Sequence, residues 1–519
     1  MKTRSFIFWI YLTALGLGCC VLVWYVTAVY GPGVGTDGAI QVSTADHLLR
    51  GQGFVDYAGN PYVRWPPLYP IVLAALSMIS GLDSLSIGWF LNIVLFGVNI
   101  FLGSALLYTC FQDEPLWAIA GSLVMATSVS LVSLSTNIGT DPLFITLVLC
   151  WLLVASRYLA SRSRAAFLST ALLACLASLQ RLPGVTLIAA GTVLILYADR
   201  EQIMRAAGKA LLFAALTSLP LVLWIVIHNN LQNNTLFGIP LFLMTQPLIN
   251  FQDSLGKILH WFMPYSASRS LPALSLVTLL ALIFLIFSRR EDWRRLGSRL
   301  LGPALLPSLV FVTFYYLFLI FTINSVDTKY IYYDRYYIVM LAPMLVLAFA
   351  VLQELLLSRF PRFKNLARLA TLLLLAAWLV FPLYNLNKYT HLGRTEGLPG
   401  YNKYNTRTLR QSKIINVLQE ISNHDQLPIY SNYPAAVWFF TRRDAPESPR
   451  GSITSPNNLQ DLLERFQGWP GNKPGYLVWF LPNDYDHVLD PQQLGQLADL
   501  TLIYQGKDGE VYQVRPSGK

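Results

Sequence analysis

The sequence predicts a polytopic α-helical membrane protein that carries a small α/β domain at its C-terminal end. Three observations support this prediction: long apolar segments alternate with short basic loops, charged residues are scarce, and the last quarter contains short strand-like runs. Of the 519 residues, 54% are hydrophobic and only 13% are charged, whereas soluble domains carry about 25% charged residues. A single soluble core stops growing near about 250–300 residues, so this much apolar sequence requires lipid as its solvent.

Eleven apolar segments are expected to cross a hydrocarbon core of roughly 30 Å, at about 1.5 Å per helical residue. The first follows Lys2 and Arg4 and is too long for the apolar core of a signal peptide, so we expect an uncleaved span. The predicted spans are residues 6–29, 85–109, 116–135, 142–159, 165–180, 184–198, 210–227, 271–287, 301–323, 338–356 and 369–386. The two segments on either side of residues 180–183 are the shortest of this set.

The distribution of charge predicts the orientation of the chain. Lys and Arg gather in short loops such as residues 288–299 and 358–368, and a cytoplasmic N-terminus places most of these loops in the cytoplasm. The net charge of +10 therefore reports orientation in an inner or plasma membrane, and it does not indicate a nucleic-acid partner. This topology requires that the apolar run at residues 68–82 does not cross fully, so we expect a re-entrant or interfacial segment there.

The orientation divides the chain into a transmembrane domain, residues 1–387, and a soluble non-cytoplasmic α/β domain, residues 388–519. In the second domain a helix is expected at residues 406–421, and strands are expected at 428–431, 476–480, 500–504 and 510–514. All five cysteines lie in or beside apolar segments, so no disulfide framework is predicted.

Three predicted non-cytoplasmic loops concentrate polar and aromatic residues, and such loops are where site residues usually occur. The first contains Asp37 in the sequence Gly-Thr-Asp-Gly and continues through Leu48-Leu49-Arg50-Gly51 to Tyr57 and to Arg64-Trp65-Pro66-Pro67-Leu68. The second contains Asp141, directly before Pro-Leu-Phe. The third contains Lys329 and the sequence Asp334-Arg335-Tyr336-Tyr337.

This ordered set of motifs resembles the protein O-mannosyltransferase and aminoarabinose-transferase group, which are membrane glycosyltransferases of the GT-C type (glycosyltransferase family 39-like). The resemblance rests on an Asp after the first span, then Leu-Leu-x-Gly and Pro-Pro-Leu, a second Asp before Pro-Leu-Phe, and a late Arg-Tyr before a span that contains Pro343. It covers roughly residues 1–390. It implies transfer of a sugar from a polyprenyl-phosphate donor to a glycan, lipid or protein acceptor, on the non-cytoplasmic side of the bilayer.

The resemblance also implies roles for individual residues. Asp37 is expected to be the base of an inverting transfer, and it has Gly38 beside it where many members of the group carry a second acid. Asp141 is expected to be a second catalytic residue, which supports the acceptor or a metal ion. No cofactor is identified, and a divalent metal is left open. The donor phosphate is expected to bind Arg335, assisted by Lys329, Arg64 and Arg181. Substrate contacts are expected from Tyr57, Trp65 and Tyr336.

Alternatives remain open at this stage. Asp141 fits a helix N-cap before Pro142, Arg335 fits an anchor at the lipid headgroups, and the aromatic residues fit an interfacial belt. A transporter or flippase for lipid-linked sugars is less favoured, because no halves repeat and ionisable residues gather at one membrane face. A ligase or polymerase that moves whole glycans shares the same features, and the sequence separates it poorly from single-sugar transfer.

Overall fold

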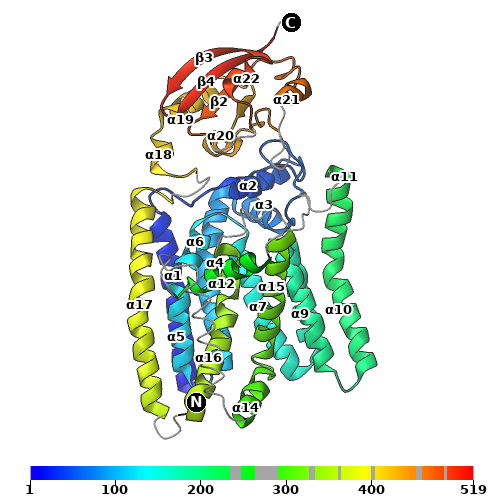
Figure 1. Cartoon of the computed structure of the whole chain (residues 1–519), viewed down its shortest axis with the longest axis vertical. Coiled ribbons are helices and arrows are strands. Elements are labelled where there is room, and N and C mark those ends of the chain that lie inside the picture. The colour runs from blue at the N-terminus through cyan, green and yellow to red at the C-terminus, as the bar shows by residue number, and fades with distance from the viewer. Residues whose placement is uncertain are drawn as a thin grey trace. The chain divides into compact units, whose positions relative to one another are not determined.

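The computed structural model describes residues 2–233, 247–262, 290–325, 334–359, 364–398, 404–451, 459–483 and 488–517 (Figure 1). The chain forms two compact units. The helical unit comprises Met1–Val26, Val63–Tyr69 and Phe90–His391. The α/β unit comprises Thr27–Tyr62, Pro70–Trp89 and Leu392–Lys519, and so contains stretches of the first loop as well as the C-terminal part. The domain boundary between residues 387 and 388 stays a prediction.

The helical unit is built from helices, most of which are apolar (Figure 1). They are α1 (Lys2–Thr27), α4 (Ser84–Cys110), α5 (Pro115–Ala126), α6 (Val129–Thr136), α7 (Asp141–Ser161), α8 (Arg164–Gln180), α9 (Val185–Ala198), α10 (Ile203–Leu223), α11 (Asn230–Asn233), α12 (Pro247–Leu259), α14 (Arg290–Leu300), α15 (Leu306–Ser325), α16 (Leu341–Arg359) and α17 (Lys364–Thr395). Short turns of other helix types complete it, namely η1 (Leu182–Gly184), the π-helix η2 (Trp224–Asn229), η4 (Asp334–Tyr336) and η5 (Ile338–Met340).

Seven helices in the described part of the chain are long and apolar enough to cross a membrane, and the bent pair α5 and α6 makes up to eight. The protein is therefore a multi-pass membrane protein, as predicted. Helix α8 and the segment Leu182–Ala198 are shorter apolar helices, and the predicted span at 271–287 lies outside the described residues. The count of eleven spans thus stays a prediction. The bend of 52° between α5 and α6 occurs where Ser128 accepts a hydrogen bond from the Leu131 backbone and so begins a new helix.

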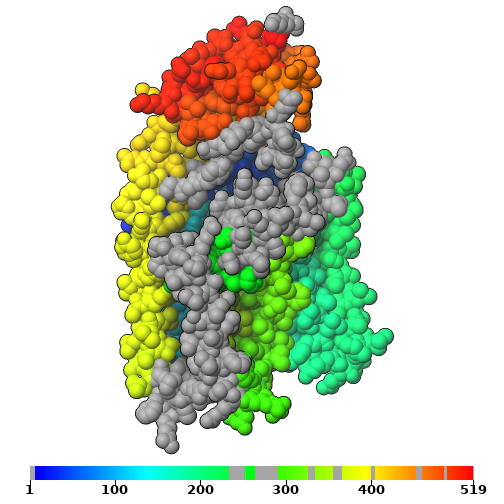
Figure 2. Space-filling model, viewed as in Figure 1, coloured from blue at the N-terminus to red at the C-terminus, as the bar shows by residue number. Residues whose placement is uncertain are grey.

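The surface of the helical unit is apolar where it is exposed. Along α17, Leu373, Leu374 and Val380 are between 61% and 72% exposed, and this helix forms the yellow surface in Figure 2. Leu211 on α10 is also 72% exposed. In water such surfaces would favour aggregation, whereas in a bilayer they face hydrocarbon.

The interior of the helical unit depends on close helix contacts. Helices α1 and α4 meet at Gly16 and Gly97, where a Cβ atom on Gly97 would lie 2.6 Å from the Gly16 carbonyl oxygen and would overlap Cys20. Small residues allow such an approach in membranes, where helix association depends on packing contacts.

The α/β unit contains α2 (Thr36–Leu49) from the first loop and, from Pro70 onward, α3 (Leu68–Ser80). With 13 residues, α3 is about 20 Å long, which is short for a full crossing. The interfacial or re-entrant placement of this segment stays a prediction. The C-terminal elements are α18 (Arg407–Arg410), α19 (Lys413–His424), β1 (Ile429–Ser431), α20 (Pro434–Thr441), α21 (Leu459–Arg465), β2 (Gly475–Phe480), α22 (Pro491–Leu494), β3 (Ala498–Gly506) and β4 (Gly509–Pro516).

The four strands form one mixed sheet in the order β1-β2-β4-β3, and only the β1–β2 pair is parallel. Ile429 pairs with Tyr476, and Gly475 pairs with Val514. The four predicted strands are confirmed, and the small α/β fold with them. Leu477 and Val514 are fully buried in the core against the sheet.

The predicted helix at 406–421 is instead two helices, α18 and α19, because a tertiary contact starts the second one. The Asp508 carboxylate accepts hydrogen bonds from the Ser412 hydroxyl at 2.5 Å and from the Ile414 backbone N–H at 2.9 Å. Burial raises the pKa of Asp508, but these hydrogen bonds outweigh it and hold the pKa below its usual value. A charged acceptor at a helix N-terminus is favourable for the helix dipole.

We predict that Gly16→Val destabilises the protein by about 1–3 kcal/mol, since the added methyl groups overpack the contact with α4. Gly18→Val is the matched control, because Gly18 lies on the same helix and a Cβ atom there would meet no other atom within 4 Å. Thermal unfolding in detergent, followed by size-exclusion chromatography, measures both variants. Equal melting temperatures for the two would contradict the close contact.

Candidate functional site

The loop between α6 and α7 is held by buried side-chain amides. Asn92 of α4 donates from Nδ2 to the Asn137 carbonyl at 2.6 Å, and Gln180 of α8 donates from Nε2 to the Thr140 carbonyl at 2.9 Å. Both donors are fully buried. Backbone groups of a loop that are shielded from water need a hydrogen-bond partner, so such amides stabilise the loop. They fix the start of α7, and with it the position of Asp141.

Asp141 forms an ion pair with Arg181, which follows the last residue of α8. The two side chains are only 8% and 12% exposed. Thr140 occupies the N-cap position of α7 and Asp141 is its first residue, so the alternative interpretation of Asp141 as the N-cap is not what the structure shows. The carboxylate instead lies in the first turn, where negative charge is favourable, and compensates a buried cation.

Tyr336 links this ion pair to Arg335. The guanidinium carbon of Arg181 lies 5.5 Å from the Tyr336 ring centre, and that of Arg335 lies 4.9 Å from it. Arg335 also donates from Nη2 to the Tyr336 hydroxyl at 2.9 Å. The backbone here is held by Tyr315, whose hydroxyl donates to the Tyr336 carbonyl at 2.9 Å. We call Asp141, Arg181, Arg335 and Tyr336 the arginine cluster; cation–π contacts of this kind orient guanidinium groups.

The side chains of the arginine cluster have the chemistry that suits an anion. Guanidinium groups present several N–H donors in a plane that matches phosphate oxygens. Arg181 has a carboxylate partner in Asp141, and Arg335 contacts the ring and the hydroxyl of Tyr336. The neighbouring Asp334 accepts a hydrogen bond from the Ser130 hydroxyl at 3.2 Å. Within the described ranges, no three His, Cys, Asp or Glu side chains gather where they could hold a metal ion.

Arg64 and Lys329 were also predicted for the donor site. Arg64 is exposed, and its guanidinium carbon lies 5.2 Å from the centre of the Trp65 ring. Lys329 lies outside the described residues. The predicted roles of Arg64, Trp65 and Lys329 stay predictions.

Asp37 belongs to the α/β unit, where it lies half-buried in the first turn of α2. The segment before it is tied to the C-terminal part of the chain. Tyr404 donates from its backbone N–H to the Val34 carbonyl at 2.8 Å, and its hydroxyl lies 3.0 Å from the Thr36 hydroxyl. The C-terminal part therefore positions the helix that carries Asp37.

Tyr57, predicted to contact substrate, is 3% exposed in the α/β unit. Its backbone N–H donates to the Ser43 hydroxyl at 3.1 Å, its carbonyl accepts from the Ala445 N–H at 2.8 Å, and its ring centre lies 6.3 Å from that of Trp438. Burial is the main reason that its pKa lies well above the ordinary value. These contacts favour a packing role, and a contact with substrate stays a prediction.

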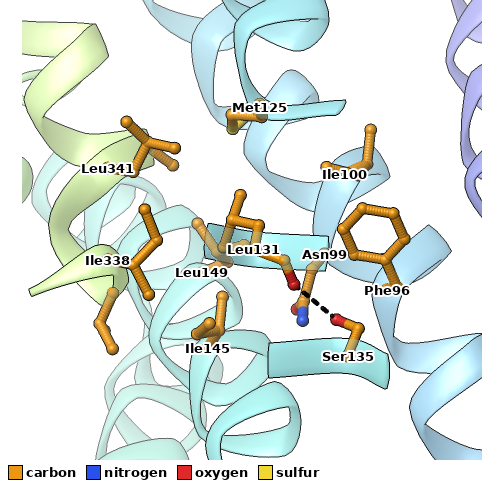
Figure 3. Close-up of a pocket in the computed structure, with 12 residues that line it drawn as sticks. Phe96, Asn99, Ile100, Met125, Leu131, Ser135, Ile145, Leu149, Ile338 and Leu341 are labelled. Atoms are coloured by element: carbon orange, nitrogen blue, oxygen red, sulfur yellow. Dashed lines mark hydrogen bonds between the residues drawn. The ribbon is translucent and has the colours of Figure 1, made fainter. Parts of the chain in front are cut away.

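A small cavity of about 20 Å³ lies in the helical unit and has room for about one water molecule (Figure 3). Its lining is mostly apolar, with Asn99 and Ser135 as the polar members. Asn99 donates to the Pro142 carbonyl at 2.9 Å and accepts from the Thr146 hydroxyl at 2.7 Å. Because its polar groups are satisfied and its volume is small, this cavity is not a candidate substrate site.

The sequence-based reasoning missed Asn92 and Gln180, the amides that hold the loop before α7, and Asn99, which binds the first turn of α7. A signal for them exists, because polar residues within an apolar span usually face the protein interior and have a specific partner. Asn92 and Asn99 are also seven residues apart, which places them on one face of α4.

No protein-family model matches the sequence, and no curated protein matches it. Solved structures do resemble it. ArnT from Cupriavidus metallidurans bound to undecaprenyl phosphate shares 14% identity, with a TM-score of 0.56 over 96% of this chain and 97% of that chain. AglB, an archaeal oligosaccharyltransferase from Archaeoglobus fulgidus in complex with an inhibitory peptide and a dolichol-phosphate, shares 12% identity, with a TM-score of 0.52 over 91% of this chain and 69% of that chain.

At this level of identity the likeness establishes the fold alone. Both proteins are glycosyltransferases of the GT-C type, so the resemblance predicted from the motifs is confirmed at the level of the fold. The chain is a multi-pass membrane protein with the GT-C fold and a small mixed sheet in its C-terminal part.

Proposed function

We propose that the protein is a glycosyltransferase that moves a sugar from a polyprenyl-phosphate donor to an acceptor hydroxyl or similar group. The observation that carries this proposal is the fold shared over 96% of the chain with ArnT, a protein bound to undecaprenyl phosphate in its structure. The acceptor is a glycan, a lipid or a protein. In the proposed topology the N-terminus is cytoplasmic, and the reaction takes place at the non-cytoplasmic face of the inner or plasma membrane, where the C-terminal part also lies.

The leaving group of this reaction is a lipid phosphate, which gains negative charge as its bond to the sugar breaks. Fixed cations stabilise such charge best in a site with little water. Arg335 is the arginine of the cluster that we assign to the phosphate, since the charge of Arg181 is already compensated by Asp141. Lys329 and Arg64 remain proposed helpers, and Tyr336 would orient the Arg335 guanidinium through its hydroxyl.

Asp37 supplies the base in this proposal. The acceptor oxygen forms a bond to the anomeric carbon, the bond from that carbon to the phosphate oxygen breaks, and the electron pair leaves with the phosphate. The acceptor proton passes to the Asp37 carboxylate. Attack from the face opposite the leaving group inverts the configuration of the anomeric carbon.

Asp141 acts through Arg181 in this proposal and does not take the proton. Its side chain is 8% exposed and its carboxylate is occupied by the ion pair, which makes it a poor acceptor for a substrate proton. A fixed Arg181 keeps its contact with Tyr336, and so supports the ring that orients Arg335. We therefore propose a positioning role for Asp141.

The likeness to AglB favours a second candidate within the same class, which is the transfer of a whole glycan from its lipid carrier. AglB is an oligosaccharyltransferase. Donors with one sugar and donors with an oligosaccharide on the same polyprenyl carrier separate the two candidates, because each should be consumed by only one of them.

We predict that Asp37→Asn lowers the transfer rate by about 100-fold or more, since a general base contributes roughly this much and the amide cannot accept the proton. Membrane vesicles supplied with radiolabelled polyprenyl-phosphate sugars measure the transfer. Asp113→Asn is the control, since it makes the same chemical change at an exposed carboxylate. Equal rates for wild type and Asp37→Asn would remove Asp37 from the chemistry.

We predict that Asp141→Asn destabilises the protein by about 3–5 kcal/mol, because it leaves the Arg181 charge buried and uncompensated. The double variant Asp141→Asn with Arg181→Gln removes both charges and should recover much of this loss. The donor KM of Asp141→Asn should rise more than its kcat falls, whereas Asp141→Glu should retain the donor KM. A single variant as stable as wild type, with unchanged kinetics, would contradict both roles.

A further inference from the structure

Two side chains on α2 have polar atoms that are buried and lack a hydrogen-bond partner among the described residues. Thr44 and Gln41 are 0% and 1% exposed, and the atoms concerned are the Thr44 hydroxyl oxygen and the Gln41 amide nitrogen, Nε2. Burial of a polar group without a partner is unfavourable. Such an atom is therefore expected where something else, a ligand or a water molecule, completes the hydrogen bond.

The Gln41 amide is held in one orientation. The hydroxyl of Tyr62, itself 1% exposed, donates to Gln41 Oε1 at 2.7 Å. Because the Oε1 atom serves as the acceptor of this bond, the Nε2 donor faces a different direction. A fixed donor without a partner is a feature of binding sites, since a flexible side chain would turn toward an available acceptor.

The two open groups share a face of α2 with Asp37. Positions 37, 41 and 44 are spaced by four and three residues, so their side chains follow one another along a single helix face. We call Asp37, Gln41 and Thr44 the polar face of α2. It begins with the proposed base in the first turn of the helix.

The other buried polar side chains of α2 are satisfied by the protein itself. Ser43 donates to the Ile40 carbonyl at 3.1 Å and accepts from the Tyr57 N–H. His47 contacts the Val55 carbonyl at 3.0 Å and the Asp444 carboxylate at 3.2 Å. Among the buried polar side chains of α2, only those on the face that carries Asp37 have atoms without a hydrogen-bond partner in the described part of the chain.

We propose that the polar face of α2 binds the sugar of the donor and that Gln41 and Thr44 form hydrogen bonds with its hydroxyl groups. Gln41 Nε2 donates to one sugar oxygen, and the Thr44 hydroxyl exchanges a hydrogen bond with another. The inference rests on the proposed function for the presence of a sugar, and it goes further by naming residues that determine specificity. A site built to hydrogen-bond a hydroxyl discriminates strongly against an analogue that lacks it.

The experiment measures binding of two ligands to the full-length protein in nanodiscs. One is undecaprenyl phosphate alone, and the other is undecaprenyl phosphate that carries mannose, glucose, arabinose or aminoarabinose. Thr44→Val and Gln41→Met each should weaken binding of the accepted sugar-bearing lipid by about 3- to 10-fold, as expected for the loss of one hydrogen bond. Neither variant should change the affinity for undecaprenyl phosphate alone, because that ligand has no sugar.

Two controls separate a binding role from a structural one. Thr217→Val makes the same change at a buried threonine whose hydroxyl already donates to the Phe213 carbonyl at 2.7 Å, and it should leave both affinities unchanged. Thr44→Ser keeps the hydroxyl and should retain binding of the sugar. Thr44→Val should melt at or above the wild-type temperature, since it removes a buried hydroxyl that has no partner among the described residues.

The outcomes separate this inference from the proposed function. If wild type prefers a sugar-bearing lipid and both variants bind it as well as wild type does, the inference is overturned and the proposed function stands. The hydrogen bonds of Gln41 and Thr44 are then completed by water. If wild type neither prefers nor transfers any sugar of the panel, the proposed function and this inference are both overturned. Weaker sugar binding in Thr44→Val that is restored in Thr44→Ser supports the inference.

Discussion

The helical unit depends on one constraint, which is that polar groups buried away from water need hydrogen-bond partners within the protein. The chain meets this constraint at the loop before α7 with side-chain amides from other helices, among them Asn92 and Gln180. Because these amides fix the backbone, the first residue of α7 has one position. The Asp141–Arg181 ion pair, and through it the contact between Arg181 and Tyr336, follows from that position.

The same constraint distinguishes structural charges from those available for chemistry. A buried arginine with a carboxylate partner is neutralised locally, and Arg181 is in this state. Arg335 contacts the ring and the hydroxyl of Tyr336, and contacts of this kind orient a guanidinium group. The two arginines lie against the same tyrosine and yet suit different tasks, which is why only Arg335 is assigned to the donor phosphate.

Much of the fold was predictable because its signals are local. Hydropathy located the long spans, and alternation of apolar residues located the four strands of the C-terminal sheet. The errors in the predicted elements arise where a residue distant in the sequence determines where a helix begins or ends. The helix expected at 406–421 is divided because Asp508 binds the backbone of Ile414, and no pattern within the segment encodes that contact.

The candidate site shows the same division between local and distant information. The adjacent residues Arg335 and Tyr336 were expected together and are in contact. Asp141 and Arg181 were named separately, and their pairing across the α7–α8 hairpin required the structure. Val34 and Tyr404 are in contact although they lie 370 positions apart in the sequence. This contact could not be predicted from the sequence either, because long-range packing leaves no periodic signal.

The central claim, that Arg335 holds the phosphate of a polyprenyl donor, is tested most directly by the affinity of the purified protein for undecaprenyl phosphate. Arg335→Gln should weaken binding by at least about 10-fold, as expected for the loss of a charge-assisted hydrogen bond. Arg162→Gln, which removes a charge in another loop, should bind like wild type. Equal affinities for wild type and Arg335→Gln, or no binding by wild type, would contradict the claim.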